Sequence, residues 1–134
     1  EIRLSLVGSE MCIRDSVIIH AIIDSLLGAM RKKDIGTFFP DNQKKYKNIR
    51  SPKMLKPIVE ILNNNNFYIN NLDINLICEQ PKVSKYRDKI IKSLSNLLNI
   101  DKELINLKGK TVEKLGLIGK EKAIACEVIC SITQ

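Results

Sequence analysis

The chain has 134 residues, 44% of them hydrophobic, which suits one domain with a single core and excludes two full domains. The formal net charge of +7 suits a polyanionic partner such as a nucleotide, a diphosphate or a nucleic acid. Lys, Asn and Ile are abundant, but an A- and T-rich genome enriches the same residues, and we weigh this explanation above selection for nucleic-acid binding. The lysines are scattered and RNA-stacking motifs are missing, so the sequence does not favour a nucleic-acid partner.

Residues 1–16 do not read as a signal peptide, because no charged segment precedes an apolar run and a cleavage site. Back-translated as GAG ATG TGT ATA AGA GAC AGN, residues 10–16 contain the mosaic-end sequence that transposase-based sequencing libraries attach to DNA fragments. We therefore predict that residues 1–16 are translated adapter, disordered and without consistent contact with the core. The native domain is expected to cover residues 17–134.

An apolar helix is predicted from Val17 to Met30 and should be buried on most sides, although it is too short to cross a bilayer. It carries His20, the single histidine of the chain. A lone histidine on an apolar helix is more often a hydrogen-bonded core residue than a metal ligand, since a zinc site needs three protein ligands. Asp24, one turn later, either orients the imidazole or is a plain buried partner.

This helix is expected to end at residues 34–36, with Gly36 at a positive φ angle. A second helix is predicted to begin with Ser51 as N-cap and Pro52 at the first helical position. Pro57 should kink this helix or delay its start. The asparagine run at residues 63–66 should end it.

The remaining elements follow from periodicity. Residues 70–78 alternate as a strand does, residues 84–99 form an amphipathic helix, and residues 105–108 form a short strand. Residues 111–115 are expected to form a tight helical turn, and residues 123–132 a last strand with apolar residues on both faces. The order predicts an α+β fold, a mixed sheet covered on one face by helices.

The cysteines form no CxxC pair, and Cys126 and Cys130 share one face of the last predicted strand. We expect reduced core thiols in a cytoplasmic protein.

Candidate chemistry lies at the loop ends. Thr111 would cap a helical turn whose free N–H groups favour an anion, and Glu113 could hold a divalent cation. Lys82, Lys110 and Lys120 lie on connections where they could neutralise phosphates. The alternative, which composition and spacing alone favour, is that Thr111 and Glu113 only cap the turn and the lysines are solvated.

From Val17 onward the chain resembles one family, the 2-C-methyl-D-erythritol 2,4-cyclodiphosphate synthases. The motifs that carry the resemblance are, in chain order, His20-Ala21 with Asp24, Leu26-Leu27-Gly28-Ala29, Asp34-Ile35-Gly36, Phe39-Pro40-Asp41, Asn71-Leu72-Asp73, Gln80-Pro81-Lys82, Asn106-Leu107-Lys108, Thr111 with Glu113-Lys114-Leu115-Gly116, and Ile124-Ala125-Cys126-Glu127.

The resemblance implies a lyase of isoprenoid-precursor synthesis, in the methylerythritol phosphate pathway. Its substrate would be 4-diphosphocytidyl-2-C-methyl-D-erythritol 2-phosphate, cyclised by intramolecular phosphate attack with release of CMP. It also implies a cytoplasmic homotrimer with active sites between subunits, a zinc or similar divalent cation, and a magnesium or manganese ion. Neither a membrane nor a nucleic acid is an expected partner.

The resemblance also assigns residues. His20 would bind zinc together with an Asp-x-His pair from an N-terminal strand, Glu113 would bind the second metal, and Thr111 would polarise the phosphate. Substrate contacts are implied for Asp34, Ile35, Gly36, Phe39, Pro40, Asp41, Cys78, Gln80, Pro81, Lys82, Lys110 and Lys120. Of these, residues 34–36 would hold the methylerythritol diol, and residues 78–82 with Lys110 would surround the cytidine.

Residues 17–134 lack the family's N-terminal strands, its Asp-x-His pair and its His-Ser-Asp loop. Three interpretations therefore remain. The native gene product is a metal-dependent cyclase, the chain as written is an inactive trimer-forming fragment of it, or the chain is a basic nucleic-acid-binding module.

Overall fold

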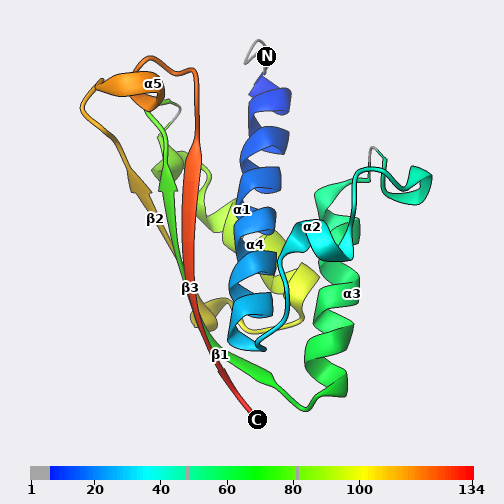
Figure 1. Ribbon diagram of the computed structural model, residues 1–134. Helices are drawn as coiled ribbons and strands as arrows, with labels where there is room; N and C mark the ends of the chain where they lie inside the picture. Colours follow the sequence, from blue (N-terminus) through cyan, green and yellow to red (C-terminus); the bar gives the residue numbers. More distant parts are fainter. Residues whose placement is uncertain (1–6, 48, 81) are drawn as a thin grey trace.

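The fold is built on a three-stranded mixed sheet of order β2-β1-β3. The computed structural model describes residues 7–47, 49–80 and 82–134, with side chains from residue 15 onward. The central strand β1 (Tyr68–Ile77) runs parallel to β2 (Ile105–Lys110) and antiparallel to β3 (Ala125–Thr133). Figure 1 shows α1 (Val7–Ala29) between this sheet and α3 (Ser51–Asn64), with α4 (Arg87–Leu98) beside α1. The predicted α+β fold, with a mixed sheet covered on one face by helices, is confirmed.

The helix α1 fills the middle of the molecule, where it packs against β3 on one side and α3 on the other. Its inward-facing residues are at most 2% exposed, and they are Ile18, Ile19, Ile22, Ile23, Leu26 and Leu27. Burying one such side chain contributes about 1.5–3 kcal/mol relative to leaving it in water. In the described part of the chain, no helix combines the length and hydropathy needed to cross a membrane.

The start of α1 differs from the disorder that the sequence predicts for its first residues. The helix begins at Val7 and passes through residue 16 without a break, while residues 1–6 lie outside the described part of the chain. Ser16 also contacts the domain, since its Oγ lies 2.7 Å from the Oγ of Ser51. Once a helix is nucleated, each added residue gains one hydrogen bond, so the buried turns can extend it.

The end of α1 comes earlier than predicted. Arg31 takes a φ of 58°, and the N–H of Lys32 donates to the carbonyl of Leu27 at 2.8 Å, a closure that stops an α-helix. The expectation that Gly36 ends it at a positive φ is wrong. Gly36 lies inside a separate short helix, α2 (Ile35–Phe38), which Asp34 caps.

The helix α3 starts where the sequence predicts, but two details differ. Its N-cap is Arg50, so Ser51 is the first helical residue, and Pro57 lies inside an uninterrupted helix. Proline removes one hydrogen bond there, and the burial of neighbours such as Leu55 and Ile58 offsets that loss. The predicted end is confirmed, because Asn65 is the C-cap and Asn66 has a φ of 58°.

The strands carry the alternation that the sequence predicts for β1. Its inward side chains Leu72, Ile74 and Leu76 are fully buried, and Cys78 follows on the same side. In β3 apolar residues lie on both faces, as predicted, but Ile129 on the outward face is 73% exposed. The described helices cover the other face of the sheet (Figure 1).

Short elements complete the chain. A 3-10 turn η2 (Val83–Lys85) precedes α4 and delays its start, and two others are η1 (Lys44–Tyr46) and η3 (Lys102–Leu104). The predicted helical turn from Thr111 is wrong. Glu113 and Lys114 have φ angles of 53° and 64°, which no α-helix accepts, and the short helix α5 (Gly116–Gly119) begins only afterwards.

Replacing Ile74 by alanine tests this core. The side chain is fully buried on the central strand, so Ile74→Ala should lower the free energy of unfolding by about 2–5 kcal/mol, measured by urea denaturation. The matched variant Ile74→Val, which loses one methylene, should cost only about 0.5–1.5 kcal/mol. Equal and small losses in both variants would contradict the packing described.

Candidate functional site

The imidazole of His20 lies on the exposed side of α1, not in the core. Its Nε2 is 3.4 Å from the Oγ of Ser51, a buried hydroxyl at the start of α3. The described side chains form no group of three or more His, Cys, Asp or Glu that could hold a metal ion. His20 is therefore accessible as one donor, but the described residues of a single chain do not complete a zinc site with three protein ligands.

Asp24 neither orients the imidazole nor lies buried, so both expectations for it are wrong. It is exposed one turn after His20, and its Oδ1 accepts the backbone N–H of Ile35 at 3.0 Å. This bond ties the loop before α2 to the side of α1. Asp24 thus fixes the position of residues 34–36, which the family resemblance assigns to the substrate diol.

Asp34 is the N-cap residue of α2. Its Oδ1 accepts the backbone N–H of Thr37 at 3.0 Å and the Thr37 hydroxyl at 2.8 Å. These hydrogen bonds, helped by the nearby charge of Lys33, hold the pKa of the Asp34 carboxyl below its usual value. An exposed carboxylate with a fixed backbone is a suitable acceptor for hydroxyl groups of a ligand.

The Phe39-Pro40-Asp41 turn is anchored by its aromatic residue. Phe39 is buried and meets Tyr46 edge to face, with ring centroids 5.3 Å apart. Asp41 is exposed. Of the three, only Asp41 therefore presents a polar side chain to solvent.

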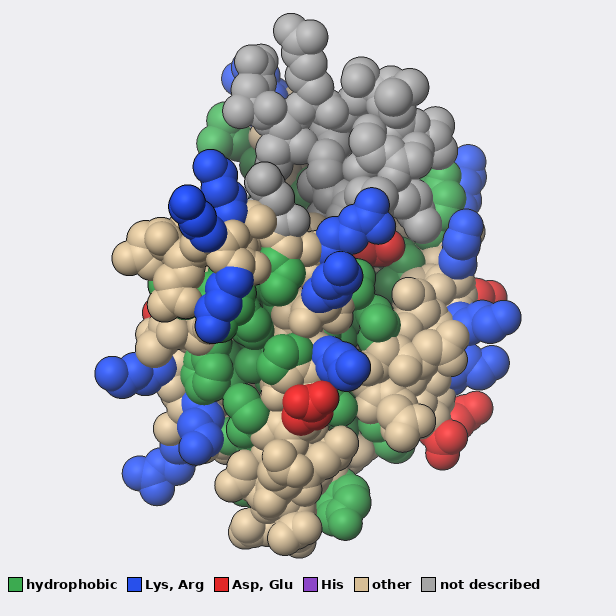
Figure 2. Space-filling view, turned by 90° about the vertical axis from the view of Figure 1, so that its right-hand side faces the viewer, with side chains coloured by type: hydrophobic (Ala, Val, Ile, Leu, Met, Phe, Trp, Pro, Cys, Tyr) green, Lys and Arg blue, Asp and Glu red, His purple; other side chains and the backbone are tan. Residues whose placement is uncertain are grey.

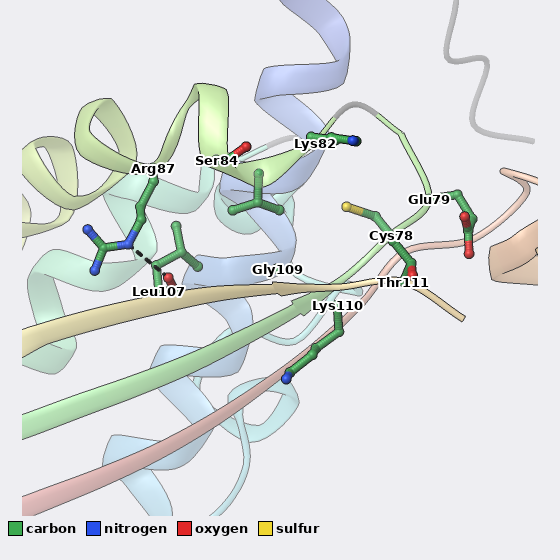
Figure 3. Close-up of a pocket in the computed structure, with 10 residues that line it drawn as sticks. Cys78, Glu79, Lys82, Ser84, Arg87, Leu107, Gly109, Lys110 and Thr111 are labelled. Carbon is green, nitrogen blue, oxygen red and sulfur yellow. Dashed lines mark hydrogen bonds between the residues drawn. The ribbon is translucent and has the colours of Figure 1, made fainter. Parts of the chain in front are cut away.

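A pocket of about 290 Å³ lies where the parallel strands β1 and β2 end. Figure 3 shows its walls, which are Cys78, Glu79, Lys82, Val83, Ser84, Arg87, Leu107, Gly109, Lys110 and Thr111. Four predicted site residues meet here, namely Cys78, Lys82, Lys110 and Thr111. The carboxyl ends of parallel strands are a frequent place for ligand binding.

The two lysines of this pocket point to different sides. In Figure 3 the Lys82 side chain lies above the strands, whereas Lys110 extends below them. Lys110 shares the outward side of β2 with Lys108, whose Nζ donates to Asp73 at 2.8 Å. Lys110 thus borders both the pocket and the face of the sheet opposite the helices.

Gly109 lets β2 approach η2 at the back of the pocket. A Cβ on Gly109 would lie 2.8 Å from the Cβ of Val83, so any side chain would push this wall outward. Arg87 closes one end, since its Nε donates to the Leu107 carbonyl at 3.1 Å and its Nη2 to Asn106 Oδ1 at 3.2 Å. The position of Arg87 depends on the packing of α4 against β2, which the sequence pattern did not indicate.

Glu79 lies within residues 78–82, which the family resemblance places around the cytidine, but the sequence did not indicate its contacts. Its Oε1 accepts the backbone N–H groups of Val112 at 2.8 Å and of Lys114 at 3.1 Å. The turn that it holds carries Thr111 and Glu113, both exposed. The local signal for these contacts was that Glu79 is a charged residue directly after a predicted strand and at the start of a loop.

The other predicted site residues in the described part of the chain do not line this pocket, among them His20, Glu113 and residues 34–36 and 39–41. Gln80 is exposed and does not line the pocket, and Lys120 lies after α5. Pro81 lies outside the described residues.

The thiol of Cys126 is a poor nucleophile. Burial, with a smaller effect of the Glu127 charge, raises the pKa of the Cys126 thiol to about 11, so it stays protonated at neutral pH. Among the described side chains, Cys78, Cys126 and Cys130 form no disulfide bond.

The basic surface is dispersed. Figure 2, seen from the side of α3, shows Lys and Arg side chains distributed among hydrophobic and other side chains. A nucleic-acid-binding face usually concentrates such charges in a patch or stripe. This view therefore does not favour the nucleic-acid interpretation.

Fold and pocket together define an α+β protein with a pocket at the carboxyl ends of two parallel strands. The sequence matches the model of the YgbB family over residues 15–133. The chain belongs to this family, whose curated members include proteins named 2-C-methyl-D-erythritol 2,4-cyclodiphosphate synthase, and the predicted resemblance is confirmed.

Individual relatives agree with this assignment. The bifunctional enzyme IspD/IspF of Pelagibacter ubique is 50% identical over 115 residues, which cover 86% of this chain and 31% of that protein. The synthase of Clostridium acetobutylicum is 45% identical over 114 residues, covering 85% of this chain and 74% of the relative. The chain thus spans about a third of the bifunctional relatives and most of the single-function one.

A solved structure shows the same fold with a nucleotide. The IspF protein of Plasmodium falciparum, in a CDP complex, superposes with a TM-score of 0.76 at 44% identity. The superposition covers 87% of this chain and 69% of that one.

The cap of α2 should respond to acid. Because hydrogen bonding lowers the folded-state pKa of Asp34, its carboxylate stabilises α2 above the unfolded-state pKa, and this contribution is lost as pH falls through the folded-state value. The Thr37 amide proton in an NMR titration should therefore shift with a midpoint below that of a free aspartate. In Asp34→Asn this acid transition should vanish, and a wild-type midpoint at or above the free value would contradict the cap.

Proposed function

We propose that the complete protein is a 2-C-methyl-D-erythritol 2,4-cyclodiphosphate synthase of isoprenoid-precursor synthesis. It would convert 4-diphosphocytidyl-2-C-methyl-D-erythritol 2-phosphate into 2-C-methyl-D-erythritol 2,4-cyclodiphosphate and CMP. The observation that carries this proposal is the pocket at the ends of β1 and β2, in a chain whose fold matches a relative solved with CDP. The absence of a disulfide bond among the described cysteines suits the proposed cytoplasmic location.

The reaction needs no side-chain nucleophile. An oxygen of the 2-phosphate forms a bond to the β-phosphorus, and the bond from that phosphorus to the bridging oxygen breaks, so the electron pair leaves with CMP. Both groups belong to one molecule, which makes alignment the main task of the protein. In this proposal the pocket holds the cytidine, Asp34 binds the diol and the Thr111 hydroxyl donates to a phosphate oxygen.

The described residues supply one proposed ligand to each of two metal ions. His20 would give one nitrogen to a zinc or similar divalent cation, and Glu113 one carboxylate to a magnesium or manganese ion. When bound, these ions would spread the charge that develops on the phosphates. The other zinc ligands would come from an Asp-x-His strand, as the family resemblance implies, since the described residues supply one.

A homotrimer is the proposed assembly. The face of the sheet opposite the helices carries Ile129, which is 73% exposed, together with Ile77 on β1. The Asp73–Lys108 ion pair lies on this same face and satisfies two of its charges at 2.8 Å. A large exposed aliphatic side chain on a flat sheet face, beside paired charges, suits packing against further copies of the chain.

His20 tests the reaction and the metal together. We expect the 134-residue chain as given to hold no stoichiometric zinc and to release no CMP, because His20 alone cannot bind zinc tightly. A protein that also carries an Asp-x-His strand and a His-Ser-Asp loop ahead of Val17 should do both, with zinc measured by atomic emission and CMP by chromatography.

His20→Ala in that longer protein should abolish both zinc binding and CMP release. The control Glu60→Ala, an exposed position on α3, should leave both unchanged. Full zinc content in the His20 variant, or turnover by the 134-residue chain, would contradict the role assigned to His20.

Ile129 tests the assembly. Ile129→Asp places an unpaired charge on the open sheet face, and burying it between subunits would be strongly unfavourable. Sedimentation velocity of the longer protein should then show a trimer for the wild type and monomers for this variant. Lys92→Asp, on the exposed side of α4, should remain trimeric; a trimeric Ile129→Asp protein would exclude this face as the interface.

A further inference from the structure

The turn after β2 holds two proposed functional groups on an unfavourable backbone. Thr111 and Glu113 lie on it, and Glu113 and Lys114 have φ angles of 53° and 64°. Residues with a side chain rarely adopt this left-handed region, and consecutive ones persist only when surrounding contacts hold them. The contacts that hold this turn therefore matter for the position of both groups.

Glu79 supplies the contacts on one side. The backbone N–H of Cys78 donates to the Lys110 carbonyl at 3.0 Å, and this is the last described backbone hydrogen bond between the ends of β1 and β2. One residue further, Glu79 Oε1 accepts the N–H groups of Val112 at 2.8 Å and of Lys114 at 3.1 Å. Where the backbone pairing of the two strands stops, the Glu79 side chain thus connects the end of β1 to the turn after β2. Hydrogen bonds to a carboxylate are stronger than neutral ones.

The short helix α5 supplies the contacts on the other side. A Cβ on Gly119 would lie 2.1 Å from the carbonyl carbon of Lys114, so only glycine permits this approach. Within the turn, the N–H of Leu115 donates to the Val112 carbonyl at 3.1 Å. The turn is held between Glu79 and α5, and Glu79 is its link to the pocket wall.

We propose that Glu79 is a positioning residue. Its carboxylate fixes the backbone at Val112 and Lys114, so that the hydroxyl of Thr111 and the carboxylate of Glu113 keep a constant place relative to the nucleotide pocket. This proposal rests on the proposed function of Thr111 and Glu113. Glu79 also lines the pocket, and the alternative that it binds the nucleotide directly is an outcome of the test.

The contact itself is tested by amide hydrogen exchange, which does not depend on activity. Glu79→Ala should speed exchange at the amides of Val112 and Lys114 at least about tenfold, because their acceptor is lost. The amide of Ile74 in β1 should not change. Glu79→Gln, which keeps a carbonyl oxygen in the same place, should restore most of the protection. Unchanged exchange at both turn amides in Glu79→Ala would overturn the proposal.

The consequence is tested by the kinetics of CMP release in the complete protein. A misplaced turn should lower kcat on the order of 100-fold in Glu79→Ala with little change in KM, and Glu79→Gln should recover most of kcat. Glu60→Ala is the control for loss of one carboxylate. A raised KM with unchanged kcat would overturn positioning in favour of direct nucleotide binding. If the wild type released no CMP, the proposed function would fail, whereas the exchange result would still decide the contact.

Discussion

The apolar surface of α1 packs against the inner face of the sheet and against α3. Without α1, the apolar side chains of both would be exposed to water. Leu72, Ile74 and Leu76 on β1 reach full burial only beneath the helix layer. The same helix carries His20 and Asp24 on its exposed side. Core and site are therefore coupled through one rigid element, because any change that tilts α1 moves the imidazole and the Asp24 carboxylate together.

The loops around the site share one physical device, a carboxylate that accepts backbone N–H groups. Asp24 holds the N–H of Ile35, Asp34 holds that of Thr37, and Glu79 holds two in the turn after β2. Loop backbones cannot pair as strands do, so side chains must satisfy their donors. A chain with a net charge of +7 can use carboxylates in this way and still keep an overall positive charge.

Periodicity predicted the elements that bury an apolar face. The alternation in β1 fits only a strand, and the repeat that contains Ile91 and Leu94 fits only a helix, if the apolar side chains are to be buried on one face. What failed depended on local closure or on distant partners. Arg31 ended α1 before Gly36 could, and the turn at Glu113 took left-handed angles that spacing does not encode.

The candidate site divides in the same way. Family motifs located Cys78, Lys82 and Thr111, which meet in the pocket because β1 and β2 are parallel and end together. Glu79 and Arg87 act on residues at least twenty positions away, at Val112 and Leu107. The pairing of β1 with β2 brings Glu79 close to Val112, and the packing of α4 against β2 brings Arg87 close to Leu107, so no local pattern could have indicated these contacts.

The bond from Arg87 to the Leu107 carbonyl also bears on how the sheet ends. The strand β2 is an edge, and an edge strand with free acceptors invites the addition of a foreign strand. Here the Arg87 guanidinium donates to one of those acceptors, the Leu107 carbonyl (Figure 3). Its second nitrogen donates to Asn106 Oδ1. Lateral growth of the sheet on this side would have to displace Arg87. The contact of Arg87 with Leu107 therefore opposes the addition of a foreign strand at β2.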